Sequence, residues 1–210
     1  MRILVTAGPT REWLDPVRFI SNPATGRLGY LVAREAVRRG MEVFLVSGPT
    51  VLEPPPGVRF SPVETAREMY RAVRKIFPAA NALFMTAAVG DWRPRLRRDK
   101  IKKKSPGTRI SLALYPNPDI LAACGRLKKS GQVLVGFALE TRDPAAGARK
   151  KILAKNLDYI LVNDPGFFGA AAGPHRSVLI SAAGDASDLS VCSKEEVAQF
   201  LLEHCLPRAR

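Results

Sequence analysis

Positively charged side chains are concentrated in one short segment of the sequence. Residues 93–104 contain eight arginines and lysines and a single acid, Asp99, in a chain with 33 basic and 19 acidic side chains and a formal net charge of +14. A dense group of cations attracts polyanions. The charge alone leaves three interpretations open: a solvated loop, a nucleic-acid site, or a site for a phosphorylated small molecule.

Other polar residues follow the apolar runs, at the positions where strands would end. Lysines, a carboxylate and a helix start are the groups needed to hold a nucleoside triphosphate with Mg²⁺. Gly26 opens the first helical segment, and the free N–H groups of a helix start suit a phosphate. The remaining candidate residues that follow the apolar runs are Asn22, Asp91, Lys100, Asn117, Pro118, Asp119, Phe137, Lys151 and Lys155.

The connection between the first apolar run and the first helix is unusually long. It extends from Ala7 to Gly26, whereas a βα turn usually takes about two to six residues. Ligands of open α/β sheets bind at the carboxyl ends of the strands. We therefore expect this loop to carry function.

Several enzyme classes lack their signatures in this sequence. In a nicotinamide-dependent dehydrogenase the glycine fingerprint follows the first strand directly, and here the glycines come about eighteen residues too late. There is no GxxxxGK[ST] loop, HExxH pair or GxSxG elbow. The three cysteines are widely spaced without a CxxC pair, which argues against a disulfide framework or a cysteine zinc site. With no long apolar run and no signal-peptide pattern, we expect a cytoplasmic protein that does not contact membranes.

Short apolar runs alternate with amphipathic segments, which predicts an α/β fold. Two consecutive βαβ units favour a Rossmann-like, doubly wound, mostly parallel sheet with helices on both faces. Asn117 precedes Pro118, and Ser193 precedes Glu196 by three residues, so both sites are expected to start helices. With no linker or repeat, we predict a single domain over residues 1–210. The expected strands are Arg2–Ala7, Glu42–Ser47, 81–87, 108–114, 132–138 and 158–163, with an edge hairpin at 177–181 and 187–191; the expected helices are 26–40, 65–77, 117–128, 143–155 and one after Ser193.

Taken together, the motifs resemble phosphopantothenate–cysteine ligase (phosphopantothenoylcysteine synthetase) of coenzyme A biosynthesis. Each motif is weak alone, but in this order and at these spacings they are highly specific, and they cover almost the whole chain. They are TAGPTRE at 6–12, LDPVRFISN at 14–22, TGRLG at 25–29, AAVGDW at 87–92, KIKK at 100–103, NPDI at 117–120, GFALET at 136–141 and KNLD at 155–158.

The resemblance implies a two-step ligation. The carboxylate of 4′-phosphopantothenate attacks the α-phosphorus of CTP, which releases pyrophosphate and leaves an acyl-cytidylate. The amino group of L-cysteine then displaces CMP and forms the amide. The first step brings a carboxylate beside a triphosphate, so cations must offset their repulsion.

The resemblance also implies roles for individual residues. Lys100 would hold the triphosphate and stabilise developing charge, and Asp91 would lie at the nucleotide, directly or through Mg²⁺. Asn22 would hydrogen-bond the activated acyl group, while Arg18 and Gly26 would contact phosphopantothenate. The base and ribose pocket, with the lysines that reach the nucleotide from the next helix, would comprise Asn117, Pro118, Asp119, Ile120, Phe137, Lys151 and Lys155.

The same resemblance bears on partners. It implies a homodimer whose neighbouring protomer completes each site. Many bacterial members continue from a flavin-dependent decarboxylase, so a separate decarboxylase is a candidate partner and no flavin is expected in this chain. The loop 169–177 departs from the family pattern, and Pro116 stands where a lysine is common. The alternative function is a basic nucleic-acid-binding module, but residues 93–104 lack interleaved aromatic residues and no such motif accompanies them.

Overall fold

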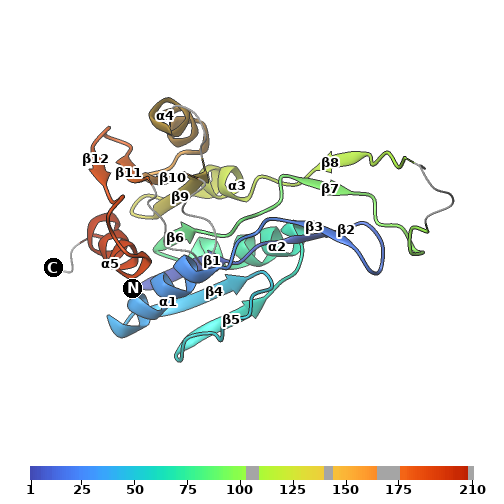
Figure 1. The fold of residues 1–210 in the computed structure, drawn as a ribbon. Coiled ribbons are helices and arrows are strands. Elements are labelled where there is room, and N and C mark those ends of the chain that lie inside the picture. The colour runs from blue at the N-terminus through green and yellow to red at the C-terminus, as the bar shows by residue number, and fades with distance from the viewer. Residues whose placement is uncertain (103–108, 140–143, 165–175, 208–210) are drawn as a thin grey trace.

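The core of the molecule is one eight-stranded sheet between two layers of helices (Figure 1). The computed structural model describes residues 1–102, 109–139, 144–164 and 176–207. The sheet strands are β1 (Arg2–Ala7), β4 (Glu42–Ser47), β5 (Val58–Pro62), β6 (Ala82–Met85), β9 (Val133–Leu139), β10 (Tyr159–Asn163), β11 (Ser177–Ser181) and β12 (Ala186–Asp188).

The strand order is β12-β11-β10-β9-β6-β1-β4-β5. The strands from β5 to β10 are parallel, whereas β11 and β12 form an antiparallel hairpin at the edge. The predicted fold class, with its doubly wound sheet and edge hairpin, is confirmed.

The helices cover both faces of the sheet. They are α1 (Arg27–Arg38), α2 (Ala66–Ile76), α3 (Ile120–Leu127), α4 (Pro144–Lys155) and α5 (Lys194–Cys205), with a short 3₁₀ turn at Phe77–Ala79. α1 and α5 pack on the face that receives Ile3 and Val5 of β1, and α2, α3 and α4 pack on the face that receives Leu4. Successive side chains of a strand point to opposite faces, so a strand covered on both sides needs an unbroken apolar run. None of the described helices is long and apolar enough to cross a membrane.

Two small hairpins project from the sheet. One pairs β2 (Arg11–Trp13) with β3 (Phe19–Ser21), and the other pairs β7 (Trp92–Pro94) with β8 (Leu114–Pro116). Figure 1 shows both reaching out from the same side of the sheet. We call the second hairpin, with the described residues of 92–116, the arm.

Two predicted strand positions are wrong, and one strand of the central sheet was not predicted. The strand expected at 108–114 begins only at Leu114, because β7 is three residues long and pairs with Leu114–Pro116 alone; residue 108 lies outside the described residues. The strand expected at 187–191 ends at Asp188, whose carboxylate accepts the Ser190 N–H (2.9 Å) and turns the chain. β5 was not predicted, since it is an edge strand without a buried apolar run.

Of the three predicted helix starts, one is confirmed, one is wrong and one lies outside the described residues. Ser193 and Glu196 form the expected capping box of α5. The cap of α3 is Asp119 and not Asn117, because the Asp119 carboxylate accepts the Ala122 N–H (2.9 Å). The expected cap Asp143 of α4 lies outside the described residues.

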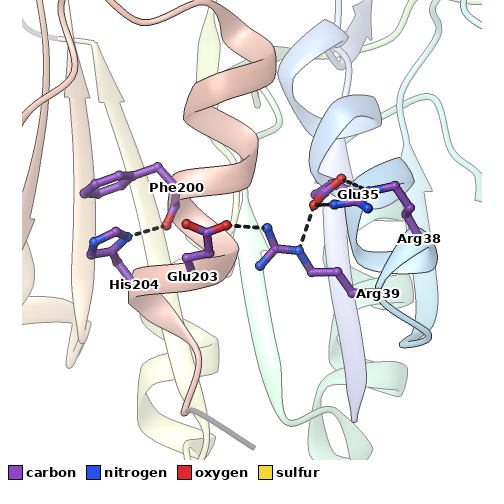
Figure 2. A network of polar contacts seen from close by, with 6 residues as sticks. All are labelled: Glu35, Arg38, Arg39, Phe200, Glu203 and His204. Atoms are coloured by element: carbon purple, nitrogen blue, oxygen red, sulfur yellow. Dashed lines mark hydrogen bonds and ion pairs between the residues drawn. The ribbon is translucent and has the colours of Figure 1, made fainter.

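A buried carboxylate at the end of α1 holds the arginine that reaches α5 (Figure 2). Glu35 accepts hydrogen bonds from Arg38 and Arg39, each at 2.7 Å, and Arg39 also pairs with Glu203 of α5 at 2.9 Å. The hydrogen bonds from Arg38 are the main cause that lowers the pKa of Glu35 to about 2, while burial opposes the shift. The ionised carboxylate therefore stabilises the folded state.

Glu35→Gln is expected to lower the free energy of unfolding at neutral pH by about 1–2 kcal/mol, because solvent screens the exposed Arg38. The folded pKa lies below the ordinary value, so the stabilisation is complete above about pH 5 and is lost as the pH falls toward 2. Urea unfolding of parent and variant across this range measures the effect. A stability difference that stays constant down to pH 2 would contradict it.

Candidate active site

The carboxyl ends of β1 and β6 open into a cavity of about 540 Å³. The chain leaves β1 for β4 on one side and β6 for β9 on the other, so the loops diverge at this point. Such a crevice is where ligands of open α/β sheets bind. Of the predicted site residues, the cavity brings together Asn22, Gly26, Asp91, Phe137, Lys151 and Lys155.

Two threonines join the strand ends beneath the cavity. The Thr86 hydroxyl donates to the Thr6 carbonyl (2.6 Å), and the Ala87 N–H donates to the Thr6 hydroxyl (3.2 Å). Further out, the Ala88 N–H donates to the carbonyl of Gly8 (3.0 Å). The loops after β1 and β6 are therefore held together where a ligand would lie.

Asn22 lies at the rim of this cavity, just after β3. Its side-chain amide donates to the Ala88 carbonyl at 3.2 Å, and the neighbouring Ser21 hydroxyl donates to the carbonyl of Thr10 at 2.8 Å. The long loop predicted to carry function thus folds back on the loop after β6.

The first turn of α1 forms one wall. Gly26 is the N-cap residue with φ 78°, a conformation that favours glycine. A Cβ on Gly29 would lie 2.4 Å from the Thr86 hydroxyl oxygen, so only glycine lets the helix approach β1 and β6 this closely. The helix start therefore lies directly on the joined strand ends.

Cations surround the cavity from both helix layers. Arg27 of α1 pairs with Glu195 (2.8 Å), and Lys155 of α4 pairs with Asp119 (2.8 Å). Burial and the nearby Arg27 lower the pKa of Lys194, the first residue of α5. Among the lining residues that the structure describes, Asp91 is the only acid. The cavity is thus suited to a polyanion.

The residues of the NPDI motif lie behind the cavity wall. Asn117 donates its side-chain N–H to the Gly90 carbonyl and its backbone N–H to the Asp91 carbonyl, both at 2.8 Å. Pro118 separates this contact from Asp119, and Ile120 is buried. Burial opposes ionisation of Asp119, but the Ala122 amide and Lys155 outweigh it and lower its pKa. The motif therefore supports the loop of Asp91 and pairs with one lining lysine.

Lys100 and Arg18 lie elsewhere. Lys100 is exposed and does not line the cavity of its own chain. The Arg18 guanidinium pairs with Asp15 (3.4 Å) and donates to the Ile101 carbonyl (2.9 Å). We expected the lysine-rich segment to face a bound ligand. In the structure Lys100 lies on the arm, away from the cavity lining of its own chain. Lys103 and Lys104 lie outside the described residues.

Sequence reasoning missed some of the lining residues. Lys194 and Asn163 both line the cavity. Asn163 had a usable signal, since it ends an apolar run and so marks the carboxyl end of a strand. Lys194 had none, because a lysine that begins a helix at the far end of the chain carries no mark of what the helix faces.

Comparison with known proteins identifies the family. Residues 1–207 match the family described as DNA/pantothenate metabolism flavoprotein C-terminal domain. The coenzyme A biosynthesis bifunctional protein CoaBC of Bacillus subtilis is 42% identical over 204 residues, which are 96% of this chain and 50% of that protein. CoaBC of Escherichia coli is 45% identical over 166 residues, 78% of this chain and 41% of that protein. The chain thus spans about half the length of the curated relatives it matches.

Solved structures agree with this assignment. The crystal structure of the C-terminal domain of CoaBC has a TM-score of 0.81 and 38% identity, and the match covers 96% of this chain and 92% of that one. A Cab2 variant in complex with phosphopantothenate-cysteine shares the fold at a TM-score of 0.75 and 18% identity, over 96% and 85% of the two chains. The chain belongs to the DNA/pantothenate metabolism flavoprotein C-terminal domain family.

Proposed function

We propose that this protein ligates 4′-phosphopantothenate to L-cysteine in coenzyme A biosynthesis, with CTP as the activating nucleotide and an acyl-cytidylate as the intermediate. The cavity at the ends of β1 and β6 carries the proposal, because it gathers cations, Asp91 and Asn22 where a nucleotide would bind. The coenzyme A role in the names of the relatives and the phosphopantothenate-cysteine in the Cab2 complex support the same chemistry.

The charges around the cavity suit the activation step. A carboxylate does not react with an amine until its oxygen becomes part of a good leaving group, and here CMP is that group. The attack brings one anion to another, so lysines placed beside the phosphates lower the barrier. Lys151, Lys155 and Lys194 would face the phosphates, and Asn22 would hydrogen-bond the acyl oxygen.

Asp91 fits a Mg²⁺ ion that arrives with the nucleotide. Within the described part of the chain no three acidic, histidine or cysteine side chains cluster as a metal site. Mg²⁺ is commonly held by one or two carboxylates together with substrate phosphates, so a single acid is sufficient. When bound, the ion would neutralise phosphate charge, and Asp91 would orient it. No step requires a flavin.

We infer a homodimer from the arm. Trp92 and Leu96 are exposed by 55% and 63%, and Tyr115 on the opposite strand by 47%. Large exposed apolar side chains gathered on one element mark an interaction surface. A second copy packed on the arm would cover them and bring Lys100 to the cavity of its partner. The protein would act in the cytoplasm, with a separate decarboxylase as a further partner.

The activation step is tested without the second substrate. Protein mixed with CTP, Mg²⁺ and phosphopantothenate, but no cysteine, is expected to release a burst of pyrophosphate, because the intermediate forms and stays bound. Pyrophosphate is measured by a coupled assay, with pantothenate lacking its phosphate as the control substrate. No burst, together with salt-sensitive binding of an oligonucleotide, would favour the nucleic-acid alternative.

Lys100→Gln is expected to slow this burst by about 10²–10³-fold, the effect of losing one preorganised electrostatic contact. Rapid-quench measurement of pyrophosphate gives the rate. Lys75→Gln, an exposed lysine on α2, is the matched control and should leave the rate unchanged. A parental rate in the Lys100 variant would remove that residue from the site.

Mixing two inactive variants tests the shared site. Lys100→Gln damages the arm and Lys155→Gln damages the cavity, so an equal mixture of the two dimers after subunit exchange should recover about a quarter of the parental activity. Recovery requires that one intact cavity meets one intact arm from the other chain. Activity no greater than that of either variant alone would show that each chain uses its own Lys100.

A further inference from the structure

The turn of the β2–β3 hairpin encloses a carboxylate that sequence reasoning did not single out. Asp15 is fully buried. Its Oδ1 accepts the backbone N–H groups of Val17 (2.8 Å) and Arg18 (2.9 Å). These contacts are local and shape the turn.

The second oxygen of Asp15 reaches a distant part of the chain. Oδ2 accepts the Ile101 N–H at 2.9 Å, across 86 residues of sequence. The Arg18 guanidinium, paired with the same oxygen, donates to the Ile101 carbonyl at 2.9 Å. Both polar groups of the Ile101 backbone are thus held by the hairpin.

A second contact holds the segment on the other side of Lys100. The Arg97 N–H donates to the Leu14 carbonyl at 2.9 Å. Lys100 therefore lies between two attachment points on one turn, and its side chain remains exposed. The hairpin fixes the backbone from which this lysine extends.

The ionised form of Asp15 is the one that makes these contacts. A carboxylate accepts hydrogen bonds at both oxygens and donates none, which matches the three N–H groups around it. The hydrogen bond from Ile101 is the largest cause that lowers the pKa of Asp15, with burial opposing and the Val17 and Arg18 amides adding to it. At neutral pH the contact to the segment of Lys100 is therefore intact.

We propose that Asp15 is a positioning residue for the activation step: its carboxylate, with Arg18, holds the backbone at Ile101 so that Lys100 meets the nucleotide. This inference rests on the proposed function. It also gives Arg18 of the β2–β3 turn a contact with the arm, where the family resemblance alone implied a contact with phosphopantothenate.

Asp15→Asn separates the contacts of Oδ1 within the turn from the contact of Oδ2 with Ile101. The amide keeps one oxygen for the Val17 and Arg18 N–H groups, but places an NH₂ donor against the Ile101 N–H. We expect hydrogen–deuterium exchange of the Ile101 amide, followed by NMR, to accelerate by about 10–100-fold. Glu35→Gln is the matched control: it also removes a buried carboxylate, but one that binds Arg38 and Arg39 at the end of α1, and it should leave this amide at the parental rate.

Kinetics distinguish positioning from a general loss of stability. Asp15→Asn should slow the pyrophosphate burst at least about ten-fold, and Asp15→Asn combined with Lys100→Gln should be no slower than Lys100→Gln alone, because both changes remove the same interaction. Glu35→Gln should keep the parental burst. If the two residues acted independently, the fold-reductions in burst rate of the two single variants would multiply in the double variant.

The outcomes are separable. A parent protein without a burst contradicts the proposed function, whereas a parental burst that Asp15→Asn leaves unchanged contradicts only the positioning role. Multiplicative effects in the double variant, or an unchanged Ile101 amide, also overturn it. If Asp15→Asn fails to fold, Ile101→Pro removes the same hydrogen bond from the segment without touching the hairpin, and the same burst and double-variant tests apply.

Discussion

The parallel pairing of β1 with β6 is the constraint on which the site depends. These central strands send the chain to opposite sides of the sheet, so the loops that follow them diverge and leave a space between. The hydrogen bonds of Thr6 with Thr86 and Ala87 hold the two strand ends together. Because both strands are buried on both faces, this floor is rigid, and every lining side chain is placed relative to it.

The charge of the cavity is a product of the layered fold. Arg27 and Lys194 come from α1 and α5 on one face of the sheet, while Lys151 and Lys155 come from α4 on the other. Without a ligand, Glu195 and Asp119 partly balance two of these cations. A polyanion bound in the cavity could take the place of these two carboxylates as the partner of the cations.

The basic residues of the arm, including Lys100, belong to a structural unit separate from the cavity lining. The arm is attached to the β2–β3 hairpin by contacts of Asp15 and Leu14, and at its base Arg93 donates to Asn117, beside the loop of Asp91. This divides the proposed machinery into a rigid pocket and a presented segment. In the homodimer that we propose, nucleotide binding and assembly of the two chains would depend on each other, because a cavity would reach its full set of cations only with an arm docked.

The sequence by itself determined most strands of the central sheet and the helices that cover it, because apolar runs and helical periodicity report burial locally, and it determined the family through its motifs. It also located the α5 capping box, whose contacts span only Ser193 to Glu196. It misplaced the α3 cap by two residues and could not locate β2, β3, β5 or β7, which are short and stabilised by partners far along the chain. Only the tertiary structure decided that Lys194 lines the cavity, that Lys100 does not, and that Asp15 holds Ile101. Each of these depends on contacts between segments distant in sequence, which no local pattern records.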